Sequence, residues 1–93
     1  MRERNIEQYL VLGVKKRKGF CIKLLGLIGI PDRLVLLPMK FIVFIETKTA
    51  RGKLSPLQKQ WEKWLTNTGF PHQVIRSKVE VDEFLSNYDK DQK

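Results

Sequence analysis

Two carboxylates, Asp32 and Glu46, stand almost alone in a basic stretch of this chain. They are the only acids between Gln8 and Trp61, whereas eleven Lys and Arg residues fall in the same stretch. Two adjoining carboxylates repel each other if both are ionised and dry, so either one keeps a proton or a divalent cation lies between them. Hard oxygen ligands with positions left for water and phosphate suit Mg²⁺. The pair therefore indicates metal-assisted chemistry on a polyanion.

The residues around the two acids predict strands that would bring them together. Residues 33–37 and 41–46 are apolar runs separated by the short turn 38–40, which predicts an antiparallel hairpin. Asp32 begins one strand and Glu46 ends the other. Lys48 follows Glu46 by two residues and faces the same side of its strand, where an ammonium can orient a water or help to deprotonate it.

The other elements are predicted from periodicity and end signals. An amphipathic helix is expected at residues 2–18, a strand at 20–25, a strand at 73–76 and a short final helix after Ser77. Another helix begins with Ser55 as N-cap, Pro56 at its first position and a glutamine three residues after the cap. Its apolar residues are expected to form a buried stripe: Leu57, Trp61, Trp64 and Leu65.

The element order predicts an α/β domain over residues 1–93 with the order αβββαβα, a mixed central sheet and flanking helices. The strand at 41–46, with its nearly continuous apolar residues, is expected at the centre of the sheet and buried on both faces. Residues 88–93 are expected to be a polar tail.

Composition restricts the classes of function. Eighteen Lys and Arg against ten Asp and Glu give a net charge of +8, which favours a polyanionic partner such as DNA. A single cysteine excludes an intrachain disulfide and any multi-cysteine metal site, and a single histidine excludes a histidine cluster. Neither a signal peptide nor an apolar run of membrane-spanning length is visible. We expect a cytoplasmic protein that does not enter membranes.

Three motifs carry a resemblance to a known family. Gly-Ile-Pro-Asp-Arg-Leu at 29–34, Glu-Thr-Lys at 46–48 and Arg-Gly-Lys-Leu-Ser-Pro-Leu-Gln at 51–58 closely resemble the VRR-NUC nucleases. These are a branch of the PD-(D/E)xK, or restriction-endonuclease-like, superfamily. The acid, acid and lysine pattern alone occurs widely, and the third motif makes it specific. The chain departs from the family at Val74-Ile75-Arg76, where the family has Val-Arg-Arg.

The resemblance implies a Mg²⁺- or Mn²⁺-dependent endonuclease acting on DNA. Asp32 and Glu46 would be metal ligands, Lys48 would lie at the attacking water, and Gln58 would match the glutamine beside the site. Glu7 would match the acid on the first helix, which can reach the metal or a metal-bound water; a solvated helix-face carboxylate is the alternative. By likeness to minimal phage-type members and to Holliday junction resolvases, the chain would be a homodimer acting on branched DNA in a bacterial or phage-infected cell.

Basic and polar residues supply the candidate DNA contacts. These are Lys15, Lys16, Arg17, Lys18, Arg33, Arg51, Lys53 and Ser55. For the helix-end run a solvated surface is the alternative, and for Ser55 its capping role suffices. Two other interpretations of the whole chain remain open: a non-cleaving DNA-binding module of nuclease fold, and a small basic assembly protein whose acids only cap a basic face. For the single residues, Asp32 could be a turn residue after proline, and Glu46 a charge at a strand end that pairs with Lys48.

Overall fold

Strand order follows chain order in the central sheet. The computed structural model describes residues 2–92; residues 1 and 93, which end the predicted domain and tail, lie outside the described residues. The elements are α1 (Glu3–Lys16), β1 (Phe20–Lys23), β2 (Arg33–Leu37), β3 (Phe41–Thr47), α2 (Pro56–Thr68), β4 (His72–Ile75) and α3 (Lys78–Asp91). The sheet order is β1-β2-β3-β4, antiparallel except for the parallel pair β3 and β4. The predicted order αβββαβα and the mixed sheet are therefore confirmed.

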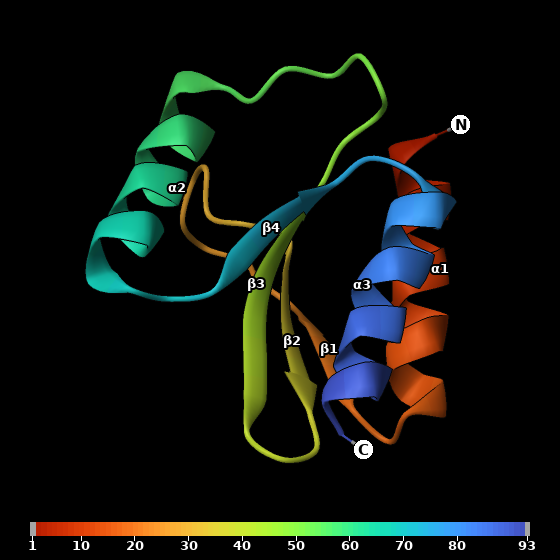
Figure 1. Cartoon of the computed structure of the whole chain (residues 1–93). Helices are drawn as coiled ribbons and strands as arrows, with labels where there is room; N and C mark the ends of the chain where they lie inside the picture. Colours follow the sequence, from red (N-terminus) through yellow and green to blue (C-terminus); the bar gives the residue numbers. More distant parts are fainter. Residues whose placement is uncertain (1, 93) are drawn as a thin grey trace.

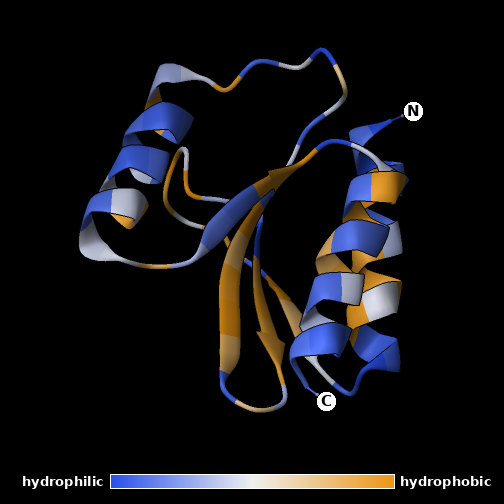
Figure 2. Ribbon diagram, viewed as in Figure 1, coloured by the Kyte–Doolittle hydropathy of each residue, from blue (hydrophilic) through white to orange (hydrophobic). Residues whose placement is uncertain are grey.

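Helices α1 and α3 lie side by side and cover one face of the sheet (Figure 1). Val35 of β2 and Val43 of β3 are buried in this layer, and Figure 2 shows β2 and β3 as largely apolar stretches of the ribbon. The buried cluster draws on α1, β2, β3, β4 and α3: Ile6, Leu10, Val14, Val35, Leu37, Val43, Ile45, Ile75, Val81, Phe84, Leu85 and Tyr88. Burial of these side chains supplies most of the driving force for folding.

Helix α2 stands apart from that cluster, on the other side of the sheet (Figure 1). Of its residues only Leu65 is buried, while Leu57 is 43% and Trp64 51% exposed. The predicted buried stripe is therefore wrong for Leu57 and Trp64. Periodicity locates an apolar face on a helix, but it does not say how much of that face another element covers.

The second face of the sheet is only partly covered, so β3 is central without being buried on both faces. Phe20, Leu36 and Ile42 pair across β1, β2 and β3 and form one row on this face. Phe20 is 69% and Ile42 49% exposed. The prediction that β3 is buried on both faces is therefore wrong.

The C-terminal helix is longer than predicted. α3 continues to Asp91, so residues 88–91, expected as part of a polar tail, form its last turn. Tyr88 is buried, packs edge-on against Phe41 and donates its hydroxyl to the carbonyl of Pro38 at 3.1 Å. This packing on the β2–β3 turn holds the end of the helix. None of the helices in residues 2–92 has the length and apolar character needed to cross a membrane.

Candidate metal centre

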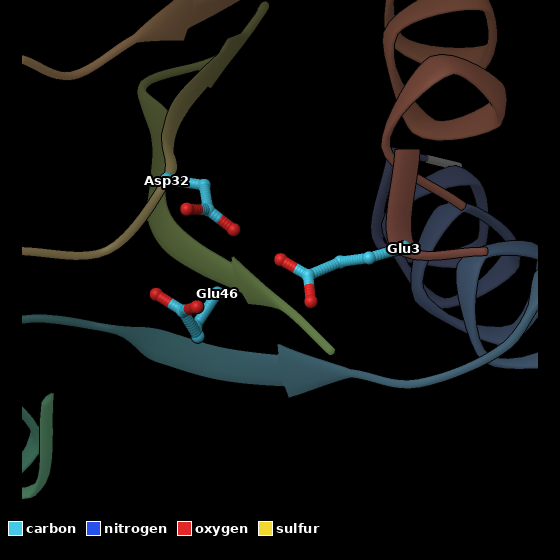
Figure 3. A group of neighbouring side chains, drawn as sticks. All are labelled: Glu3, Asp32 and Glu46. Atoms are coloured by element: carbon cyan, nitrogen blue, oxygen red, sulfur yellow. The ribbon is translucent and has the colours of Figure 1, made fainter. Parts of the chain in front are cut away.

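Three carboxylates meet at one end of the sheet. Glu3 comes from the first turn of α1, Asp32 from the residue before β2, and Glu46 from the end of β3 (Figure 3). Each offers an oxygen that lies within 4.8 Å of an oxygen from each of the other two. Glu46 is only 6% exposed and the other two are half-buried. Sequence reasoning identified Asp32 and Glu46 but not Glu3.

The β2–β3 hairpin places Asp32 beside Glu46. Arg33 pairs with Ile45, so the residues just outside that pair, Asp32 and Glu46, fall opposite each other. Asp32 Oδ2 accepts two hydrogen bonds from Thr47, at 3.0 Å from the backbone nitrogen and 2.8 Å from the hydroxyl. Thr47 is fully buried. It therefore fixes the orientation of the Asp32 carboxylate, a role that sequence reasoning did not assign to it.

Glu46 is held from α2 by Gln58. The Gln58 amide nitrogen donates to Glu46 Oε2 at 3.1 Å, while its amide oxygen accepts from the backbone of Ser55 at 2.8 Å. Ser55 Oγ in turn accepts from the Gln58 backbone, which completes the capping box expected from the sequence. The same contacts that begin the helix thus aim Gln58 at the carboxylate.

The other oxygen of Glu46, Oε1, is buried without a hydrogen-bond partner. A buried carboxylate oxygen with no partner is costly unless a proton or a cation satisfies it. Burial raises the pKa of Glu46 to about 8, the negative charge of Asp32 acts in the same direction, and Lys48 opposes both. The pKa of Glu3 is also raised, first by burial. The raised pKa values of Glu46 and Glu3 and the unpartnered oxygen of Glu46 therefore fit a hard divalent cation, whose charge would take the place of a proton at Glu46.

Lys48 adds a positive charge beside these carboxylates. It lowers the pKa of both Glu46 and Glu3, which places its ammonium within electrostatic range of the two groups. The side chain is half-buried, and its backbone nitrogen donates to the carbonyl of Ile75 at 3.0 Å. The site therefore combines three acids with one lysine, which directly follows β3.

Glu7 lies outside this group of carboxylates. Its Oε2 atom accepts from Arg33 Nε at 2.6 Å, and both side chains are largely buried. The structure therefore brings Glu3, rather than the expected Glu7, to Asp32 and Glu46. It also turns Arg33 toward Glu7 and the carbonyl of Cys21, at 3.1 Å, rather than toward solvent.

The predicted DNA-contacting bases fall into two separate regions. Lys15, Lys16 and Lys18 are exposed where α1 ends, about 20 Å along the helix from Glu3 by its rise per residue. Arg17 in that run makes two hydrogen bonds to Asp89, at 2.8 and 2.7 Å. The first region thus lies at the far end of α1 from the carboxylates.

The second region is the loop between β3 and α2, where Arg51, Lys53 and Ser55 are exposed. Arg76, the last residue of the Val74-Ile75-Arg76 motif, donates to the loop carbonyls of Thr49 at 2.9 Å and Gly52 at 2.5 Å. These contacts tie the loop to the end of β4. Arg51 and Lys53 therefore follow Lys48 closely in the chain, on a loop whose backbone Arg76 holds in place.

Comparisons with known proteins were made by sequence and by structure. No family model matches the chain. Over 77 residues it is 42% identical to a protein named "Putative nuclease p44" from Acyrthosiphon pisum secondary endosymbiont phage 1, and the match covers 81% of each chain. A solved structure described as a VRR_NUC domain superimposes with a TM-score of 0.85 and 29% identity. That match covers 92% of this chain and 96% of the other.

Proposed function

We propose that this chain, which belongs to the VRR-NUC family of nucleases, is a divalent-metal-dependent DNA endonuclease. The observation that carries the proposal is the group of three carboxylates from Glu3, Asp32 and Glu46, with a buried and unpartnered oxygen on Glu46. Oxygen-only ligands of this kind suit Mg²⁺, with Mn²⁺ as a substitute. The net charge of +8 supports DNA as the substrate.

Residues of this chain have distinct roles in the proposed reaction. Glu3, Asp32 and Glu46 would hold the cation, which would neutralise charge on the attacked phosphodiester and lower the pKa of a bound water. Lys48 would orient that water and stabilise negative charge on the phosphate oxygens. Gln58 would keep Glu46 in place through its 3.1 Å hydrogen bond. Arg51 and Lys53 would hold the flanking phosphates from the secured loop.

A cleavage assay tests the proposal directly. Purified protein is incubated with end-labelled DNA in Mg²⁺, in Mn²⁺, in Ca²⁺ and in EDTA. We expect cutting in Mg²⁺ and Mn²⁺ and none in EDTA, since without the metal nothing lowers the pKa of the attacking water. Binding measured in Ca²⁺ should weaken steeply as salt rises, because Lys and Arg displace condensed counterions from DNA. Salt-sensitive binding without cutting in any metal would favour the non-cleaving module instead.

The finer proposal is selectivity for branched DNA by a homodimer, as in Holliday junction resolvases. Its support is the exposed apolar row across β1, β2 and β3, with Phe20 69% and Ile42 49% exposed, because large apolar patches on small proteins commonly mark interfaces. A second copy covering this row would give the dimer two metal centres, one for each of two strands of a four-way junction. Such an enzyme would act in the cytoplasm of a bacterial or phage-infected cell.

The dimer can be tested by solution mass and by substrate preference. We expect light scattering to give twice the chain mass at micromolar concentration, and a four-way junction to be cut faster than a linear duplex of the same sequence. The double variant Phe20→Ser with Ile42→Ser should be monomeric and lose the preference for the junction. Leu12→Ser, at an equally exposed apolar residue on α1, is the matched control. A monomeric wild-type protein would exclude this arrangement.

A further inference from the structure

Helix α1 is tied down near both of its ends by an ion pair. In residues 2–92 these are the two salt bridges present: Glu7 with Arg33 at 2.6 Å, and Arg17 with Asp89 at 2.7 Å. The first lies near the carboxylate end of the helix and joins it to β2. The second lies just past the opposite end and joins it to α3. Two contacts of one chemical kind thus occur at different distances from the metal centre.

The Glu7–Arg33 pair is built into the interior rather than the surface. The side chains are 18% and 17% exposed, and Arg33 Nη1 also donates to the carbonyl of Cys21 at 3.1 Å. Arg33 therefore connects three elements, α1, β1 and β2. A guanidinium fixed by two directed hydrogen bonds defines the distance and the angle between the groups that it joins.

Both partners are adjacent to metal-centre residues. Arg33 directly follows Asp32 in the chain, and Glu7 lies one helical turn after Glu3 on the same side of α1. The contact therefore sets how the first turn of α1 lies against the start of β2. The N-cap residue Arg2 makes no side-chain capping hydrogen bond, so no cap fixes that turn. Without the pair, Glu3 would depend on packing from Ile6 onward.

We propose that the Glu7–Arg33 pair is a positioning device for the metal centre, which sets the Glu3 carboxylate against Asp32. The inference rests on the proposed metal site. It assigns Glu7 a role other than metal ligand, and it assigns Arg33 a role other than contact with DNA. Partners of this kind, which hold ligands without touching the metal, typically change metal affinity by about 10- to 100-fold when they are replaced.

Metal binding without DNA tests the proposal. Mn²⁺ titrations by calorimetry are run on the wild type, Glu7→Gln, Arg33→Lys and Glu3→Gln, with urea unfolding of each metal-free protein. We expect Glu7→Gln and Arg33→Lys to weaken Mn²⁺ binding about tenfold. Saturating metal should restore their cleavage, whereas Glu3→Gln should not recover. DNA binding by Arg33→Lys in EDTA should match the wild type.

The second ion pair supplies the matched control. Asp89→Asn removes the contact at the far end of α1, so it should lower resistance to urea and leave Mn²⁺ affinity within about twofold of the wild type, since positioning effects are local. Equal weakening of Mn²⁺ binding by Asp89→Asn and Glu7→Gln would mean general loosening and would overturn the proposal.

Other outcomes separate this proposal from the proposed function. Wild-type Mn²⁺ affinity in Glu7→Gln and Arg33→Lys would refute positioning. A Glu7→Gln protein that stays inactive at saturating metal would make Glu7 a ligand. If Arg33→Lys lost only DNA affinity in EDTA, Arg33 would be a DNA contact. A wild type that binds Mn²⁺ as described but cuts no DNA would refute the nuclease function and leave the positioning role intact.

Discussion

Replacing Glu46 by glutamine is expected to abolish DNA cleavage while leaving the protein folded and able to bind DNA. The substitution removes a charge that the metal requires but keeps an oxygen that can accept from Gln58, now at 3.1 Å. We expect a loss on the order of a thousandfold or more, which corresponds to about 4 kcal/mol of transition-state stabilisation. Asp32→Asn should behave in the same way.

The measurement compares single-turnover cleavage in Mg²⁺ with DNA binding in Ca²⁺. Glu83→Gln, which neutralises an exposed acid on α3, is the matched control for the change in net charge and should cut like the wild type. Binding of the Glu46→Gln and Asp32→Asn variants should stay close to the wild type, because both variants keep the Lys and Arg residues that contact the phosphates. Cleavage at the wild-type rate by both variants would remove these residues from the reaction.

Metal affinity is expected to rise steeply with pH up to about 8. The pKa of Glu46 is raised to about 8 from an ordinary value of 4.5, first by burial and then by Asp32. Below that pH the metal must displace a proton, so affinity should rise by nearly tenfold per pH unit, with one proton released per ion bound. Mn²⁺ titrations at several pH values, in buffers of different ionisation enthalpy, measure both quantities.

The same raised pKa fixes the sign of the stability change in the metal-free protein. Between pH 4.5 and about 8 the folded state keeps a proton on Glu46 that the unfolded state releases. The free energy of unfolding should therefore fall as pH rises through this window, by at most about 1.4 kcal/mol per pH unit. Glu46→Gln should remove most of the pH dependence of Mn²⁺ affinity and most of the pH dependence of the free energy of unfolding. Mn²⁺ affinity that is constant from pH 6 to pH 8 would contradict the prediction.

Local signals account for the parts of the fold that the sequence predicted well. The strand at residues 33–37 and the helix start at Pro56 agree with the structure to the residue. Ser55 and Gln58 form the expected capping box, and Gly69 ends α2 with a φ of 85°. Each of these signals involves residues within a few positions of one another, so no tertiary information is needed to interpret it.

The choice between Glu3 and Glu7 required tertiary information. Strand β1 runs from Phe20 to Lys23, and Lys23 pairs with Arg33, the neighbour of Asp32. The distance from the start of β1 to the level of Asp32 is therefore about 13 to 17 Å, which a helix covers in roughly nine to eleven residues. Counting back from Lys16 leads to the first two turns of α1, which hold both acids. Arg33 decides between them, because it binds Glu7 and leaves Glu3 to the cluster.

The exposure of α2 was not predictable for a related reason. Its apolar residues follow a regular helical period, which predicts one covered side. In the structure Trp61 donates its indole N–H to the carbonyl of Ile28, in the loop before Asp32, at 3.3 Å, and Trp64 stacks on Phe70. How far a helix stands from a sheet depends on the lengths of its connections and on its partners.

Helix α3 is far in the sequence from the acids and the lysine of the metal centre. All three carboxylates and Lys48 precede residue 49, whereas α3 contributes Val81, Phe84, Leu85 and Tyr88 to the buried cluster. Substitutions in α3 should thus change chiefly the stability of the protein, and those at the carboxylates and Lys48 its catalysis. Stability can thus be changed through α3 while the residues of the metal centre stay the same, because the two sets of residues lie in different segments of the chain.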